Sequence, residues 1–203
     1  MKNLIVSALL VAVISSMGCN DSSSPDSVKE AKKENDQTVD STTEVNQHNH
    51  QNSDTMLTEK DADFAVKAAD GGMMEVELGR LAQKNAASKA VKDFGQMMVD
   101  DHSKAGEELK LLTSKKRITI PATLGNDHQK KVDELSKKSG KEFDKSYTSL
   151  MVEDHEADIK EFKKQAENGS DTALKAWASS KIPILEHHLA AAKKAKDEVH
   201  GKK

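Results

Sequence analysis

Two histidines end a motif that occurs twice in the chain. Residues 94–102 and 147–155 place an aromatic residue, a methionine, a valine, an aspartate and a final histidine at identical offsets, and they end at His102 and His155. Imidazole binds transition metals and takes part in proton transfer near neutral pH. The repeat therefore predicts two related segments, each presenting a histidine that is suited to metal binding or to acid and base chemistry.

Both histidines fall on apolar faces if their segments are helical. The residues that share a helical face with each histidine, three, four or seven positions away, are small or apolar. These neighbours are Gly95, Met98, Val99, Ala105, Gly106 and Leu109 for His102, and Met151, Val152, Ile159 and Phe162 for His155. We therefore expect both imidazoles to point into a core.

A glutamate and a third histidine have similar surroundings. Glu75 shares a helical face with Ala68, Gly71, Gly72, Leu78, Gly79 and Ala82, and His188 lies against Ile184, Leu185, Ala191 and Ala192. A carboxylate buried among such residues must be paired, protonated or bound to a metal. Glu77, with Met73, Met74 and Leu81 near it, is a second-ranked candidate.

Glu75, His102, His155 and His188 each come from a different predicted long helix. Helical-bundle proteins build metal sites from Glu and His side chains that converge from facing helices. These four residues are therefore the candidate ligands of a transition metal, which could be iron, copper or zinc. A standard di-iron ferroxidase centre is not expected. It requires Glu-x-x-His, whereas Val99, Val152 and Leu185 stand three residues before the histidines.

Two pairs of residues are candidates for a supporting role. Met98 and Met151 precede their histidines by four residues, and a thioether beside an imidazole suits copper, although methionine is also ordinary core filler. Asp101 and Asp154 are placed to orient histidines on adjacent helices. The alternative to a metal centre is a structural network in which the buried glutamate and histidines satisfy one another.

Helices must position these residues, and the periodicity of apolar residues predicts helices almost to the end of the chain. Four long helices are predicted at about 59–83, 88–115, 142–167 and 170–199, with a short one at about 127–138. Pro121 marks a connector over 117–125, and Pro183 is expected to kink the last helix. The prediction is an all-α domain over 58–200, a four-helix bundle with one additional short helix.

The start of the chain has the features of an exported lipoprotein. A basic residue and an apolar run too short to span a membrane form a signal over 1–18, directly before Cys19, the only cysteine. A lipid on Cys19 would anchor the mature protein to a membrane in the cell envelope. Residues 19–57 are nearly all polar, so we expect a disordered tether.

Composition and motifs exclude several functions. The net charge is −3, which gives no electrostatic basis for nucleic-acid binding. The sequence has no haem attachment motif and no glycine-rich phosphate loop. Carboxylate and imidazole are capable of acid and base work, but no nucleophile or substrate pocket can be predicted, so an enzyme is the least favoured class.

Several segments together resemble the domain-of-unknown-function family numbered 4142. They are Asp63-Phe64, residues 72–82, Met98-Val99 through His102, Phe143-Asp144 with Tyr147, Met151-Val152 through His155, and Pro183 with Leu185, His188 and Leu189. The resemblance covers about 61–194. It implies a ferritin-like helical fold and an exported, often outer-membrane, bacterial protein, but no reaction.

Two functional hypotheses follow. The first is a lipid-anchored envelope protein, at the outer membrane or the periplasmic face, that binds a metal for metal handling or oxidative-stress defence. The second is a non-catalytic envelope protein whose helical surface binds another envelope protein or a second copy of the chain.

Overall fold

The computed structural model describes residues 25–46 and 57–201. Within these residues the protein is all-helical, with no β-strand. The six helices are α1 (Ser27–Asn46), α2 (Glu59–Asn85), α3 (Lys89–Lys116), α4 (Asn126–Ser136), α5 (Gly140–Asn168) and α6 (Thr172–His200). None of these helices combines the length and the apolar character needed to cross a membrane. The predicted signal and Cys19 lie outside the described residues.

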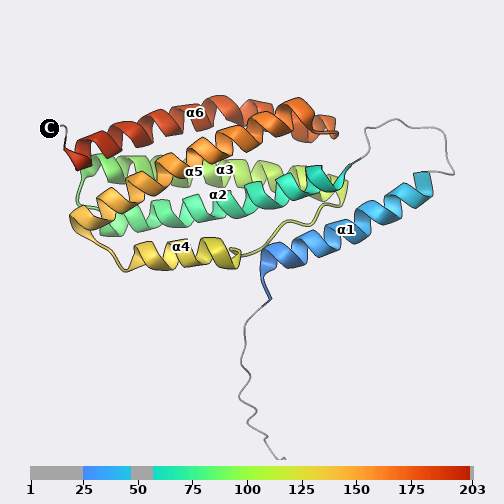
Figure 1. The fold of residues 1–203 in the computed structure, drawn as a ribbon, viewed down its shortest axis with the longest axis horizontal. Coiled ribbons are helices and arrows are strands. Elements are labelled where there is room, and N and C mark those ends of the chain that lie inside the picture. The colour runs from blue at the N-terminus through green and yellow to red at the C-terminus, as the bar shows by residue number, and fades with distance from the viewer. Residues whose placement is uncertain (1–24, 47–56, 202–203) are drawn as a thin grey trace, which may run out of the picture.

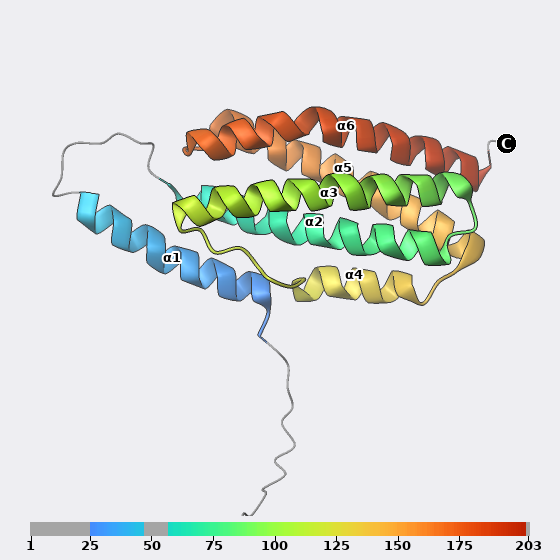
Figure 2. The same cartoon turned by 180° about the vertical axis from the view of Figure 1, so that it is seen from behind.

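Four long helices lie side by side and form a closed ring (Figures 1 and 2). Helix α2 packs against α3 and α5, and α6 packs against the same two helices. Short turns join α2 to α3 and α5 to α6, so each of these pairs is antiparallel. The connection from α3 to α5 is longer and contains α4, which runs back along the outside of α2 (Figure 1). Helices α3 and α5 therefore run in the same direction.

Glycines allow α2 and α3 to approach closely. A β-carbon added at Gly79 would lie 2.5 Å from the Gly95 carbonyl oxygen, and one added at Gly95 would lie 2.6 Å from the β-carbon of Ala82. Larger side chains would force the helices apart. Because the two helices are antiparallel, this contact sets the register that places Glu75, one turn before Gly79, near His102, two turns after Gly95.

A buried aspartate joins the start of α2 to the turn between α5 and α6. Asp61 forms a capping box with Thr58 at the start of α2. It also accepts hydrogen bonds from the Gln165 side chain at 2.7 Å and from the Ser170 amide at 3.0 Å. Burial alone would raise the pKa of Asp61, but these hydrogen bonds and those of Thr58 hold it below its ordinary value. The carboxylate therefore stays ionised and fixes one end of the ring.

The expected disordered tether was wrong over Ser27–Asn46, where the structure has α1. Ala31 and Asn35, one helical turn apart, are buried at 3% and 4% exposure. Asn35 donates to the Thr119 carbonyl at 2.8 Å and accepts from the Thr119 amide at 2.7 Å. Lys32 adds an ion pair with Asp63 at 3.0 Å. Polar contacts hold most of this helix in place, so the pattern of apolar residues in the sequence did not predict it.

Several predicted boundaries also shifted. Helix α5 begins at Gly140, with φ +59°, two residues before its predicted start. Helix α6 begins at Thr172, after its N-cap Asp171, two residues later than predicted. Helix α4 begins at Asn126, one residue before its predicted start. Helix α6 continues through Pro183.

Candidate metal centre

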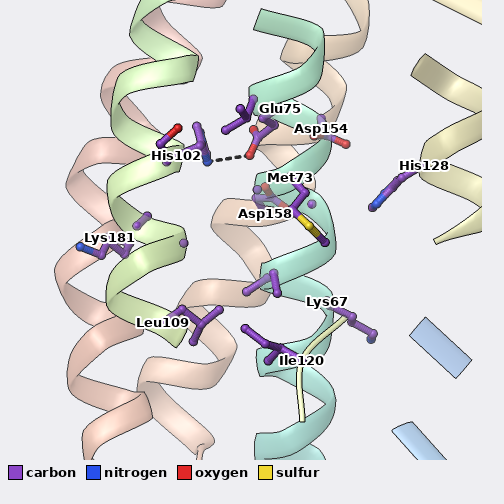
Figure 3. Close-up of a pocket in the computed structure, with 18 of the residues that line it drawn as sticks. Lys67, Met73, Glu75, His102, Leu109, Ile120, His128, Asp154, Asp158 and Lys181 are labelled. Carbon is purple, nitrogen blue, oxygen red and sulfur yellow. Dashed lines mark ion pairs between the residues drawn. The ribbon is translucent and has the colours of Figure 1, made fainter. Parts of the chain in front are cut away.

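The four predicted ligands come together in the middle of the ring, one from each long helix. Glu75, His155 and His188 are buried, and the His102 side chain is 10% exposed. The Nδ1 atom of His102 lies 2.8 Å from Glu75 Oε2, the pair marked by a dashed line in Figure 3. The Nε2 atom of His155 lies 3.4 Å from Glu75 Oε1. Glu75 therefore faces two of the three histidines.

The three imidazoles form a compact triangle. Their ring centroids are 5.9 Å apart for His102 and His155, 5.2 Å for His102 and His188, and 5.4 Å for His155 and His188. One ring nitrogen from each histidine lies within 4.8 Å of the others. This spacing allows the three nitrogens to bind a single ion after small rotations of the rings.

Hydrogen bonds at the outer ring nitrogens orient two of the histidines. His155 Nδ1 lies 2.9 Å from the Met151 carbonyl oxygen, which only accepts, so Nδ1 carries the proton and Nε2 is left with a lone pair. His188 Nε2 lies 2.8 Å from Asp101 Oδ2, which similarly leaves Nδ1 free. Metal-binding histidines are oriented by the same kind of bond, from the nitrogen that does not bind the ion.

The inward-facing atoms of the cluster have no hydrogen-bond partner. Within the described residues, this holds for His102 Nε2, His155 Nε2, His188 Nδ1 and Glu75 Oε1. The 3.4 Å contact between His155 Nε2 and Glu75 Oε1 does not have hydrogen-bond geometry. Buried polar atoms are rarely left in this state, because each one costs about 1–3 kcal/mol of desolvation. Four such atoms, one from each helix of the ring, are the strongest sign that the cluster is built to bind something.

Burial keeps these groups uncharged. It raises the pKa of Glu75 to about 8 and lowers the pKa values of His102 and His188 to about 4. The pKa of His155 is also lowered, chiefly by burial. At neutral pH the imidazoles are therefore in the deprotonated form that binds metals, and Glu75 must release a proton when a cation binds.

A second group of possible ligands adjoins the histidines. Glu75, Asp154 and Asp158 each offer a carboxylate oxygen, and these oxygens lie within 4.8 Å of one another. In Figure 3, Glu75 lies between His102 on one side and the two aspartates on the other. Burial raises the pKa of Asp154 and raises that of Asp158 well above its ordinary value. Asp158 was not among the residues predicted from the sequence, although it shares a helical face with Asp154.

A cleft of about 1080 Å³ opens beside the cluster (Figure 3). Its lining includes His102, His188, Asp154 and Asp158, and apolar side chains such as Leu109 continue it along the ring. Solvent and small ions therefore have a route to the edge of the cluster.

The remaining predicted residues have different positions. Asp101 contacts His188, but Asp154 lies 3.7 Å from Lys131 and contacts no histidine by a hydrogen bond or ion pair within the described residues. Met98 and Met151 are fully buried in the main apolar core. Glu77 is partly exposed and forms an ion pair with Arg80 at 2.5 Å. It therefore lies on the surface rather than in the cluster.

Comparisons with known proteins identify the family but no characterised relative. No curated protein and no solved structure matches the chain. Residues 46–195 match a family model, and this range includes all four long helices to within a few residues of the C-terminal end of α6. The chain belongs to that family, which is described as a domain of unknown function, DUF4142.

Proposed function

We propose that Glu75, His102, His155 and His188 bind one transition-metal ion, and that the protein serves metal handling or oxidative-stress defence in the cell envelope. The observation that carries this proposal is the set of four buried, inward-facing donor atoms without hydrogen-bond partners. A bound cation would satisfy all four atoms together and would replace the proton on Glu75.

The donor set indicates the class of metal. Three imidazoles and one carboxylate suit zinc, iron or copper and are poorly matched to calcium or magnesium, which prefer oxygen ligands. The cleft beside His102 and His188 leaves room for water or a small molecule on the ion. This access is compatible with ion exchange and with redox chemistry at the metal.

The proposal extends to the fold and the location. One long crossover between two antiparallel helix pairs is the connectivity of ferritin-like bundles, and we assign the four long helices to that fold, with α1 and α4 as additions. The signal-like sequence directly before Cys19 supports export and lipid anchoring at the outer membrane or the periplasmic face.

The second candidate is a structural network in an envelope protein that binds another envelope protein or a second copy of itself. Its support is that each histidine already has one polar partner, namely Glu75 for His102, the Met151 carbonyl for His155 and Asp101 for His188. In that case substitution of a cluster histidine would lower the melting temperature, and metal ions would have no effect.

Metal analysis separates the two candidates. The full chain is stripped with a chelator, dialysed against iron(II), copper(II) or zinc separately, and measured by mass spectrometry. We expect about one ion per chain for at least one metal, and its loss in His155→Gln/His188→Gln. His187→Gln is the matched control, because His187 is the exposed neighbour of His188 on α6. Absence of metal from the unsubstituted chain, or equal metal in the double variant, would refute the proposal.

A further inference from the structure

The carboxylate group beside the histidines has features that the proposed ion would not explain. Glu75 belongs both to the histidine cluster, through its contacts with His102 and His155, and to the group with Asp154 and Asp158. A carboxylate has about four lone-pair positions, so one glutamate can serve two cations. Glu75 is 1% exposed, and its Oε1 atom, which has no hydrogen-bond partner within the described residues, has two lone pairs, of which the proposed ion would use one.

The local positive charge is too small to balance these carboxylates. Lys131 lies 3.7 Å from Asp154, and His128 is engaged by Asp70 at 2.8 Å. Within the described residues, the Asp158 carboxylate forms no ion pair or hydrogen bond, and His128 and Lys131 act on it only through longer-range electrostatics. Three carboxyl groups that share a partly buried space without matching cations repel one another once ionised.

We infer that Asp154, Asp158 and Glu75 form a second cation position, so that Glu75 is shared between a histidine-rich ion and an oxygen-bound ion. This inference rests on the proposed function. Carboxylate oxygens favour harder divalent cations of the manganese or magnesium class, whereas the imidazoles favour zinc, copper or iron. The two positions therefore select different metals.

The cleft gives the second position direct access to solvent. Asp154 and Asp158 line the cleft and are partly exposed, whereas His155 is fully buried. A cation entering the cleft can reach the aspartates without displacing any helix. The carboxylate position is therefore the more rapidly exchanging of the two.

Titration of the full chain with two metals tests the inference. The stripped chain is first given one equivalent of zinc, and manganese(II) is then added while free manganese is followed by electron paramagnetic resonance. We expect one manganese per chain, and binding at least tenfold weaker in Asp154→Asn/Asp158→Asn. Glu153→Gln/Glu167→Gln is the matched control, because it removes two exposed carboxylates from the same helix. Asparagine keeps the shape of aspartate, and one retained zinc per double variant reports an intact histidine cluster.

A single substitution and a change of metal provide independent readouts. Asp158→Asn alone leaves the pair of Asp154 and Lys131 in place, and it should weaken manganese binding as well. With copper(II) in place of zinc, the manganese signal should broaden, because a shared Glu75 would hold the two paramagnetic ions close together.

The outcomes distinguish the two proposals. If one zinc binds but manganese does not, or if manganese binds equally to the aspartate variants, the second position is refuted and the histidine centre stands. Manganese and copper signals that remain independent would refute the sharing of Glu75. If zinc does not bind in the first step of the titration, the histidine cluster holds no metal, and both proposals are refuted.

Discussion

Glu75→Gln should change how stability depends on pH. Burial raises the pKa of Glu75 to about 8, whereas an unfolded glutamate has a pKa near 4.5. The folded metal-free protein therefore retains a proton that the unfolded chain has released, and stability falls as pH rises toward 8. The slope from this group is about 1.4 kcal/mol per pH unit.

The useful window is pH 6.5 to 8. In this window the cluster histidines are neutral in the folded state, because burial lowers their pKa values. Unfolded histidines still carry protons near pH 6.5, but they do so equally in the unsubstituted chain and in Glu75→Gln, so their contribution cancels in the comparison. Over this window the unsubstituted chain should lose about 2 kcal/mol relative to Glu75→Gln, equivalent to roughly 4–8 °C in melting temperature for a domain of this size. Glutamine stays neutral throughout, so the metal-free variant becomes the more stable protein at pH 8.

Thermal unfolding in chelator, followed by circular dichroism at several pH values, measures the difference. Glu77→Gln is the control, because Glu77 is a partly exposed carboxylate two positions away, in an ion pair with Arg80. That substitution should leave the slope nearly unchanged, since exposed pairs contribute little. Parallel pH profiles for the unsubstituted chain and Glu75→Gln would refute the argument, because they would mean that Glu75 is ionised across the whole window.

Three further substitutions test other parts of the structure. Gly79→Ala should lower the stability by about 1–3 kcal/mol in thermal melts, since its β-carbon meets α3, whereas Gly71→Ala meets nothing within 4 Å and should not. Asp101→Asn should weaken metal binding by about 10- to 100-fold, measured by competition with a chelator, by loosening the orientation of His188. Asn35→Ala should increase hydrogen exchange over α1 while α2 to α6 stay protected, and unchanged exchange would contradict the assigned role of that side chain.

Periodicity predicted the parts of the molecule that depend on apolar faces. The spacing around His102, His155 and His188 indicated three inward imidazoles, and the structure places them in one triangle. Glu75 contacts this triangle at two of its histidines. The inward direction was predictable because a histidine on an apolar helical face becomes buried when that face packs against other helices.

Features that depend on partners distant in the sequence were not predictable in the same way. Asp158 becomes a candidate ligand only because Glu75, on another helix, lies close to it. Helix α1 was missed because its docking uses an amide pair with Thr119 rather than a hydrophobic stripe. Asp154 follows the repeated motif, but the packing of α4 places Lys131 beside it instead of a histidine.

The docking of α1 changes the reach of the proposed lipid anchor. If α1 did not dock, the first contact of the chain with the ring would be at Thr58. The 39 residues from Cys19 to that point would then let the domain move up to about 130 Å from the membrane. With Ser27 hydrogen-bonded to the Thr123 carbonyl at 2.7 Å, only eight residues separate Cys19 from the docked body, a span of at most about 28 Å. A lipid on Cys19 would therefore hold this protein against the bilayer surface, within reach of headgroups and of metal ions concentrated there, rather than letting it sample the width of the compartment.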